Sequence, residues 1–209
     1  MKVLVLGAGG KTGRVVVQRA VAAGHQVTAF VHHADAYDRP AGTAVKEGDA
    51  TDAEAVAAAA AGHDAVIDTI GGRTPYRSDT TLEREVIDAV LTAMRRHAVR
   101  RLIVTSSLGV GDSVSNATVV LRLLLKTFLR GSTADKAAME QSVEASGLEW
   151  TIARPAVLGN GRATGGVRLY DPATGDKAHK ITRADLAEWL VAQLESTEHV
   201  HRTVTLAAS

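Results

Sequence analysis

The residues with the clearest chemical role are three glycines spaced by three, Gly7, Gly10 and Gly13, which follow an apolar run at residues 3–6. The run predicts a strand, and helical periodicity begins directly after the glycines. In this order the first glycine allows a tight turn, the second lets the backbone approach a pyrophosphate, and the third lets helix and strand pack closely. The amides at the helix start favour phosphate. We therefore predict a dinucleotide site, with cofactor contacts from the loop residues Gly7, Gly9, Gly10, Lys11, Thr12 and Gly13.

A triphosphate-binding P-loop is the competing interpretation, because Gly10-Lys11-Thr12 matches the end of that motif. The motif also requires a glycine at the position that Val5 occupies, inside the strand. The spacing therefore excludes the triphosphate site.

The end of the second predicted strand bears on which dinucleotide binds. An acid at this place binds the ribose of NAD, whereas a basic residue accommodates the 2′-phosphate of NADP. This chain has His32 and His33 there and no acid. An imidazole can hydrogen-bond a phosphate, so we expect a weak preference for NADP over NAD, with Lys11 as a second phosphate contact. The alternative for His32 and His33 is a solvated loop.

Two further strand ends complete the predicted cofactor site. After the third strand, Asp49 is placed to accept from an adenine amino group while the Ala50 backbone pairs with the ring; Thr51 or Asp52 would cap the next helix. Ligands of doubly wound sheets sit beyond the carboxyl ends of strands. The remaining predicted contacts at such ends are Thr69, Ile70, Gly71, Thr105 and Ser106.

Strand and helix patterns alternate along the chain, which predicts an α/β fold with a doubly wound parallel sheet, Rossmann-like, in a single domain. We expect strands at 2–7, 26–31, 43–48, 64–70, 100–106, 149–153 and 202–207, with a short one at 167–169. We expect helices at 11–23, 52–61, 80–98, 116–130, 133–146 and 183–195.

Composition excludes several functions. The net charge of the 209 residues is +1 and aromatic residues make up 3%, so we expect neither a nucleic-acid nor a membrane partner. There is no cysteine, which excludes disulfides and thiolate metal sites; we predict no metal. We find no signal peptide and no apolar run long enough to span a bilayer, and expect a cytoplasmic protein.

The stretch 119–130 is unusually apolar, and Arg122, Lys126 and Arg130 form one row along its predicted helix. It follows the strand that ends at Ser106. One interpretation is a hydrophobic wall or lid of a substrate pocket, with cations for an anionic substrate. The others are a helix packed on the core with a solvated basic stripe, or a dimer face. We therefore leave monomer and homodimer open.

Four segments carry a resemblance to a known family: Gly7–Gly13, Glu47–Asp52, Arg101–Val110, and Glu140 with Ser146–Pro155. They resemble the atypical short-chain dehydrogenases/reductases, above all the NAD(P)H-binding NmrA-like proteins and the biliverdin and flavin reductases related to them. The match continues through residues 181–187, so it covers nearly the whole chain. The resemblance implies a Rossmann core with a small substrate-binding portion at about 155–182. It also implies cofactor contacts at Thr69 to Gly71 and at Pro155, Ala156 and Val157.

Standard members of this superfamily move a proton with a serine and a Tyr-x-x-x-Lys pair. Ser107 occupies the serine position and Lys136 is the candidate lysine, but Ser132 stands where the tyrosine would be. Tyr76 and Tyr170 are the other candidates, and neither has the spacing. For Lys136 the alternative is a surface helix lysine.

The missing tyrosine leaves two functions open. The first is a reductase that transfers a hydride from NAD(P)H to a small, flat, conjugated acceptor such as a flavin, quinone or tetrapyrrole, because such an acceptor demands less proton chemistry from the protein. The second is a non-catalytic NAD(P)-binding redox sensor of the NmrA type. A nucleotide-sugar epimerase is a poorer third hypothesis, because that chemistry relies on the absent tyrosine.

Overall fold

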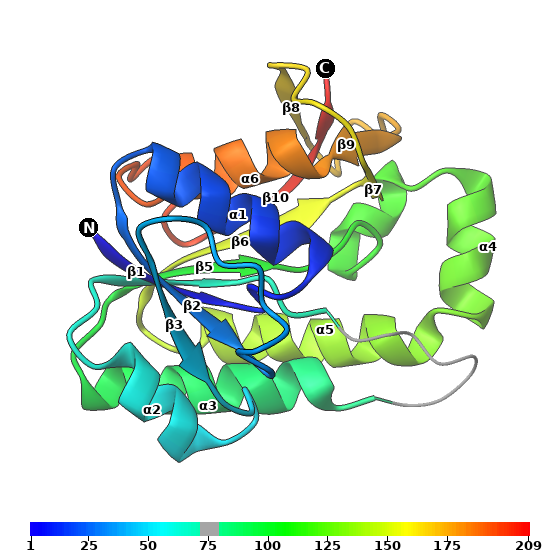
Figure 1. Ribbon diagram of the computed structural model, residues 1–209. Coiled ribbons are helices and arrows are strands. Elements are labelled where there is room, and N and C mark those ends of the chain that lie inside the picture. The colour runs from blue at the N-terminus through cyan, green and yellow to red at the C-terminus, as the bar shows by residue number, and fades with distance from the viewer. Residues whose placement is uncertain (72–79) are drawn as a thin grey trace.

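The computed structural model describes residues 1–71 and 80–209 and forms a mostly parallel sheet covered by helices on both faces (Figure 1). The strands of the main sheet are β1 (Lys2–Leu6), β2 (Gln26–Val31), β3 (Thr43–Glu47), β4 (Ala65–Asp68), β5 (Arg101–Thr105), β6 (Glu149–Pro155), β8 (Val167–Tyr170) and β10 (Arg202–Ala208). Their order is β3-β2-β1-β4-β5-β6-β10-β8, and every neighbouring pair is parallel except β10 with β8. The predicted doubly wound fold is therefore confirmed.

The helices are α1 (Lys11–Ala22), α2 (Ala53–Ala60), α3 (Leu82–Arg96), α4 (Val119–Thr127), α5 (Arg130–Glu144) and α6 (Arg183–Ala192). All of these except α4 lie in two layers, one on each face of the main sheet. Helices α1 and α6 cover one face of the sheet, α2, α3 and α5 cover the other, and α4 stands at the edge of the molecule (Figure 1). Successive residues of the central strands point to opposite faces of the sheet and pack into two apolar cores, so that Val66 faces α3 and Ile67 faces α1. No helix in the described part of the chain is long and apolar enough to cross a membrane.

The C-terminal third contains two elements that were not predicted. Strands β7 (Val157–Gly159) and β9 (Lys180–Thr182) pair in parallel as a separate small sheet. With three residues each, they are too short to show an alternating pattern. They place the backbone after Pro155 beside the start of α6.

The helix predicted over 116–130 is present but shorter, because α4 covers Val119–Thr127. A 3₁₀ turn at Gly111–Asn116 comes first, and α4 begins after Thr118, whose side chain accepts from the Leu121 amide at 3.3 Å. Serine and threonine favour such caps over helix interiors. The next helix, α5, starts at Arg130, three residues before the predicted position.

A buried ion cluster fixes the loop between β5 and α4. Arg154, on β6, donates from Nε and Nη2 to the Glu140 carboxylate at 3.0 and 2.7 Å, and from Nη1 to Asp112 at 2.5 Å. The side chains of Arg154 and Glu140 are 9% and 5% exposed. A bidentate pair of this kind has one favourable geometry, so it holds Asp112 and its loop over the end of β6.

Candidate functional site

A pocket of about 440 Å³ lies beyond the carboxyl ends of β1 to β4. Among the predicted cofactor residues, seven line it: Gly7, Gly9, Gly10, His32, Asp49, Ala50 and Ile70. They come from four loops that meet because the strands are parallel and in register, with Leu6 opposite both Phe30 and Asp68. The structure therefore brings together residues that are up to 63 positions apart, as expected for a ligand site at a topological switch point.

The glycine loop has the shape that a pyrophosphate needs. A Cβ on Gly13 would lie 2.1 Å from the Gly7 carbonyl oxygen, so this glycine permits close packing of α1 on the turn. Among the described residues, a Cβ on Gly9 would meet Val31 alone, at 3.9 Å, and Gly9 borders the pocket. The N-cap of α1 is Gly10, which has no side chain to occupy the first amides of the helix. The loop thus combines a tight turn with an open backbone surface for an anion.

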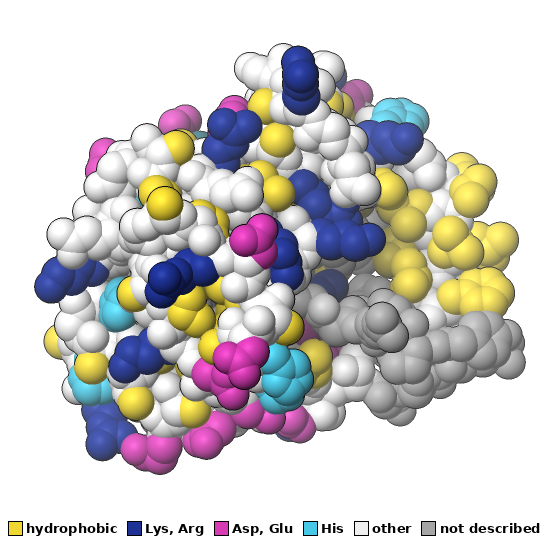
Figure 2. Space-filling view, in the orientation of Figure 1, with side chains coloured by type: hydrophobic (Ala, Val, Ile, Leu, Met, Phe, Trp, Pro, Cys, Tyr) yellow, Lys and Arg dark blue, Asp and Glu magenta, His cyan; other side chains and the backbone are white. Residues whose placement is uncertain are grey.

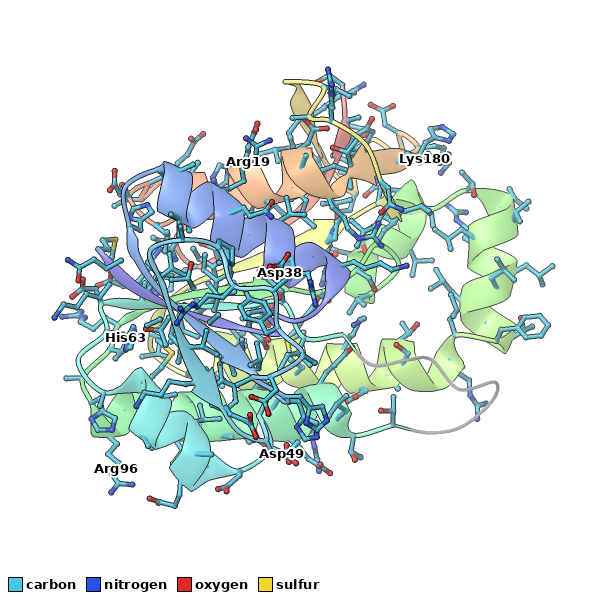
Figure 3. All side chains as sticks on the ribbon, viewed as in Figure 1. Arg19, Asp38, Asp49, His63, Arg96 and Lys180 are labelled. Carbon is cyan, nitrogen blue, oxygen red and sulfur yellow. The ribbon has the colours of Figure 1, made fainter. Side chains whose placement is uncertain are left out.

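The structure also shows what surrounds the adenine end. Asp49, in the loop after β3 (Figure 3), accepts from the Thr51 amide at 2.9 Å and the Thr51 hydroxyl at 2.7 Å. These bonds, with a smaller contribution from His32, lower the pKa of Asp49. Asp52 is the helix cap, since its carboxylate accepts from the Glu54 amide at 2.9 Å. The cap and the predicted adenine acceptor therefore use different residues.

Arg14 is a residue that the sequence interpretation missed. Its Nε donates to the Gly9 carbonyl at 3.0 Å, and its guanidinium carbon lies 5.6 Å from the centroid of the Tyr37 ring. It thereby joins the glycine loop to the loop after β2. Its position directly after Gly13 was the available signal, because that turn of α1 faces the loop.

Other predicted cofactor residues lie outside this pocket. Lys11 lines a separate hollow on the outer side of α1, with Arg162 and Arg183. Thr12 and Gly13 belong to the first turn of α1 and do not line the pocket. Thr69 donates its hydroxyl to the Leu6 carbonyl at 2.8 Å, which ties the ends of β4 and β1 together. Gly71, two residues later, does not line the pocket either.

A second pocket of about 290 Å³ lies beyond β5 and β6. It contains both predicted catalytic residues, Ser107 and Lys136, and the predicted contacts Ser106, Pro155, Ala156 and Val157. Its wall is apolar, with Leu121 and Leu125 from α4 and Leu129 from the turn that follows. The hydroxyl of Ser106, which lines this pocket, is buried without a hydrogen-bond partner in the described part of the chain, and so is that of Thr105, which precedes it at the end of β5 but does not line the pocket. Buried hydroxyls normally have partners, so they suit a polar ligand at this strand end.

A serine occupies the position of the missing tyrosine in this pocket, because Ser132 lines it one helical turn before Lys136. Tyr170 lies on β8, where the Arg168 guanidinium stacks over its ring, and it borders a different hollow. Tyr170 is therefore not among the described residues that line the second pocket. Tyr76 lies outside the described residues.

Lys136 is held by an acid that the sequence did not reveal. Its ammonium donates to the carboxylate of Glu83, in the first turn of α3, and the two side chains are 13% and 4% exposed. The preceding residue, Asp135, accepts from the amides of Glu83 and Arg84 at 3.0 and 3.1 Å and so caps α3 from outside. Two neighbouring residues of α5 thus fix the start of α3, and a surface position for Lys136 is excluded.

Asp68 is a third titratable group at the same strand ends. Burial raises its pKa to about 7; the Glu83 charge also raises it, whereas the Ile70 amide and Lys136 lower it. Its Oδ1 accepts from the Ile70 amide at 2.9 Å. A carboxyl in this state can exchange a proton near neutral pH.

We expect the stability of the protein to fall as pH rises from the ordinary pKa of 3.8 toward about 7, because Asp68 keeps its proton in the folded state over this range. Its folded pKa of about 7 lies above the ordinary value of 3.8. Between these values the folded protein binds the extra proton, so stability is lost as pH rises, with a slope approaching about 1.4 kcal/mol per pH unit. Urea denaturation at several pH values between about 5 and about 8 measures this slope. In Asp68→Asn the Asp68 part of the slope should vanish; an unchanged slope in this variant would contradict the assignment.

Comparisons with known proteins agree with this geometry. A family model described as NAD(P)H-binding matches residues 7–197. The structure of ChuY, an anaerobillin reductase from Escherichia coli O157:H7, is 29% identical with a TM-score of 0.80, covering 100% of this chain and 97% of that chain. A short-chain dehydrogenase/reductase from Veillonella parvula, solved in complex with NADP, shares the fold at 15% identity, with a TM-score of 0.82 over 99% of this chain and 94% of that chain.

A curated relative matches over a shorter stretch. The 2-alkyl-3-oxoalkanoate reductase of Stenotrophomonas maltophilia is 36% identical over 110 residues, which make up 51% of this chain. The match spans 33% of that reductase, so the matched half of the chain corresponds to about a third of its length.

Proposed function

Because the chain belongs to the NAD(P)H-binding family, we propose that it is a reductase that transfers a hydride from NAD(P)H to a small, flat, conjugated acceptor. The observation that carries this proposal is the second pocket, where an apolar wall faces Ser107 and Lys136 beside the ends of β5 and β6. Reductases with similar sequences or structures support it. A flavin, quinone or tetrapyrrole is the acceptor class that fits such a wall.

The coenzyme would lie across both pockets. The glycine loop, Asp49 and Ala50 would hold the adenosine and pyrophosphate, and Thr105, Ser106 and residues 155–157 the nicotinamide half. When bound, NAD(P)H supplies two electrons and one proton as a hydride. We infer a weak preference for NADP, with His32, which lines the first pocket, beside the 2′-phosphate. Arg14, which donates to the Gly9 carbonyl, and Lys11, which lines a separate hollow, are secondary candidates for this contact because neither lines that pocket.

The protein's own groups would orient the acceptor. The Ser107 hydroxyl and the Lys136 ammonium present donors to an acceptor oxygen or carboxylate, and Glu83 holds the ammonium in place. Leu121, Leu125 and Leu129 would cover the ring system and exclude water from the reacting face. The proton that completes the reduction would reach the acceptor from solvent, so no tyrosine is required. The segment 155–182, with β7, β8 and β9, would form the rest of the acceptor site.

A redox sensor of the NmrA type is the second candidate. The observation that favours it is the absence of a tyrosine from the described residues that line the second pocket, together with the Glu83 carboxylate that already engages Lys136. A sensor needs coenzyme binding without turnover.

Anaerobic mixing of the protein with NADPH or NADH and a panel of flavins, quinones and tetrapyrroles tests the proposal. We expect tighter binding of NADPH and a fall in reduced-nicotinamide absorbance with at least one acceptor. Ser107→Ala and Lys136→Met should lower kcat/KM about tenfold to a hundredfold, and coenzyme affinity less. Lys46→Met, an exposed lysine, is the matched control.

Two outcomes would contradict the proposal. Binding without oxidation across the panel would favour the sensor. A clear preference for NADH would refute the role of His32 and Arg14.

A further inference from the structure

Helix α4 exposes an apolar face. Val119, Val120, Leu123 and Leu124 are 78%, 71%, 64% and 39% exposed. Figure 2 shows these hydrophobic side chains gathered over α4 at one edge of the molecule, where Figure 1 places the helix away from the main sheet. Such a concentration on a nine-residue helix is more than scattered surface apolar residues explain.

The opposite side of the same helix faces the second pocket. Leu121 and Leu125 line the second pocket, and Leu125 is 9% exposed. The helix therefore has apolar side chains on both its inner and its outer side, whereas an ordinary surface helix turns polar residues to the outside. Its one polar residue on the outer side, Thr127, donates its hydroxyl to the Leu123 carbonyl at 2.8 Å, which leaves no unsatisfied donor there.

Cations border the apolar face. Between Asp112 and Asp135 the chain carries Arg122, Lys126 and Arg130 and no acid. Arg122 is fixed at this border, because its guanidinium donates to the carbonyls of Val114 and Ser115 at 2.9 and 2.6 Å. Lys126 and Arg130 are exposed. An apolar strip with a cationic border matches the chemistry of an anionic lipid surface.

We propose that the outer face of α4, formed by Val119, Val120, Leu123 and Leu124, docks the protein onto an anionic lipid surface. The apolar side chains enter the interface, and the cations remain at the level of the headgroups. The net charge of the whole chain is +1 because acidic residues elsewhere balance these cations, so the net charge alone does not reveal this surface. Docking also brings the second pocket close to the lipid, because Leu121 and Leu125, which line that pocket, belong to the same helix as the docking face.

A second copy of the chain is a poorer occupant. A stable protein interface buries about 1,200–2,000 Å² in total, more than a face of four side chains on a short helix provides. A two-fold contact through α4 would also bring Lys126 and Arg130 of both copies to one interface, and the segment between Asp112 and Asp135 offers no acid to pair with them.

Sedimentation with vesicles tests the proposal on the full-length protein. We expect binding to vesicles of phosphatidylcholine mixed with phosphatidylglycerol, weaker binding to phosphatidylcholine alone, and release by salt. Leu123→Asp should lower the partition coefficient by about tenfold or more, and Lys126→Gln by about fivefold. The control is Leu169→Asp on β8, where the leucine is 41% exposed; circular dichroism checks that each variant is folded.

A reporter variant gives an independent readout. Tryptophan at position 123, introduced as Leu123→Trp, should shift its emission to the blue with mixed vesicles and be quenched by brominated lipid. No binding to the mixed vesicles, or equal loss in Leu123→Asp and Leu169→Asp, overturns the proposal. Dimerisation in solution that Leu123→Asp abolishes, without vesicle binding, assigns the face to a second copy instead.

Discussion

Gly9→Val should weaken NADPH binding by about a hundredfold or more, close to 3 kcal/mol, and leave the melting temperature almost unchanged. Within the part of the chain that the structure describes, a Cβ at Gly9 meets Val31 alone, at 3.9 Å, so the fold accommodates a side chain there. The added atoms occupy the pocket wall that the pyrophosphate must approach. Titration by NADPH fluorescence and a thermal melt of the same sample measure both quantities.

Gly13→Ala is the matched comparison for this prediction. Its Cβ would lie 2.1 Å from the Gly7 carbonyl oxygen, which is backbone, so α1 must move and stability must fall. If Gly9→Val lowers stability as much as Gly13→Ala does, the two glycines share one structural role and the assignment of Gly9 to the ligand is wrong.

Arg154→Met should lower the free energy of unfolding by about 3–5 kcal/mol, because it leaves the buried Glu140 carboxylate without its guanidinium. For a chain of this length such a loss lowers the melting temperature by about 10 °C. Urea denaturation measures the effect. The control is Arg168→Met, which removes an exposed pair with Asp176 and should change stability by less than about 1 kcal/mol.

The double variant Arg154→Met/Glu140→Leu separates charge from packing. Replacing both buried partners with apolar residues is often close to neutral, so we expect it to recover most of the lost stability. A double variant as unstable as Arg154→Met would instead assign the loss to the shape of the site or to the Asp112 contact.

Local patterns predicted most of the fold and the first half of the site. Each of these patterns, the spacing of Gly7, Gly10 and Gly13 or an apolar central strand, can be recognised within a short stretch of sequence. Parallel pairing of the strands then brings His32 and Asp49 to the glycine loop. The orientation of Lys11 was not predicted, because a loop residue can point to either side of a helix start.

The second half of the site depends on contacts between distant residues. Lys136 and Glu83 are 53 positions apart on different helices, and no periodicity links them. The same holds for Asp135, whose capping of α3 replaces the local cap that Thr81 does not provide. The break before α4 was visible as Thr118, a capping residue, but the apolar run that follows concealed it.

The position of β10 makes one edge of the sheet depend on a distant part of the chain. β8 precedes β10 by about thirty residues and, among the described strands, pairs with the main sheet through β10, which lies between β6 and β8. β10 in turn pairs with β6 over Arg202–Leu206. Pairings between residues this far apart in the sequence close long loops, so they slow folding. A substitution that weakens the pairing of β10 with β6 therefore also loosens β8, although β8 itself is unchanged.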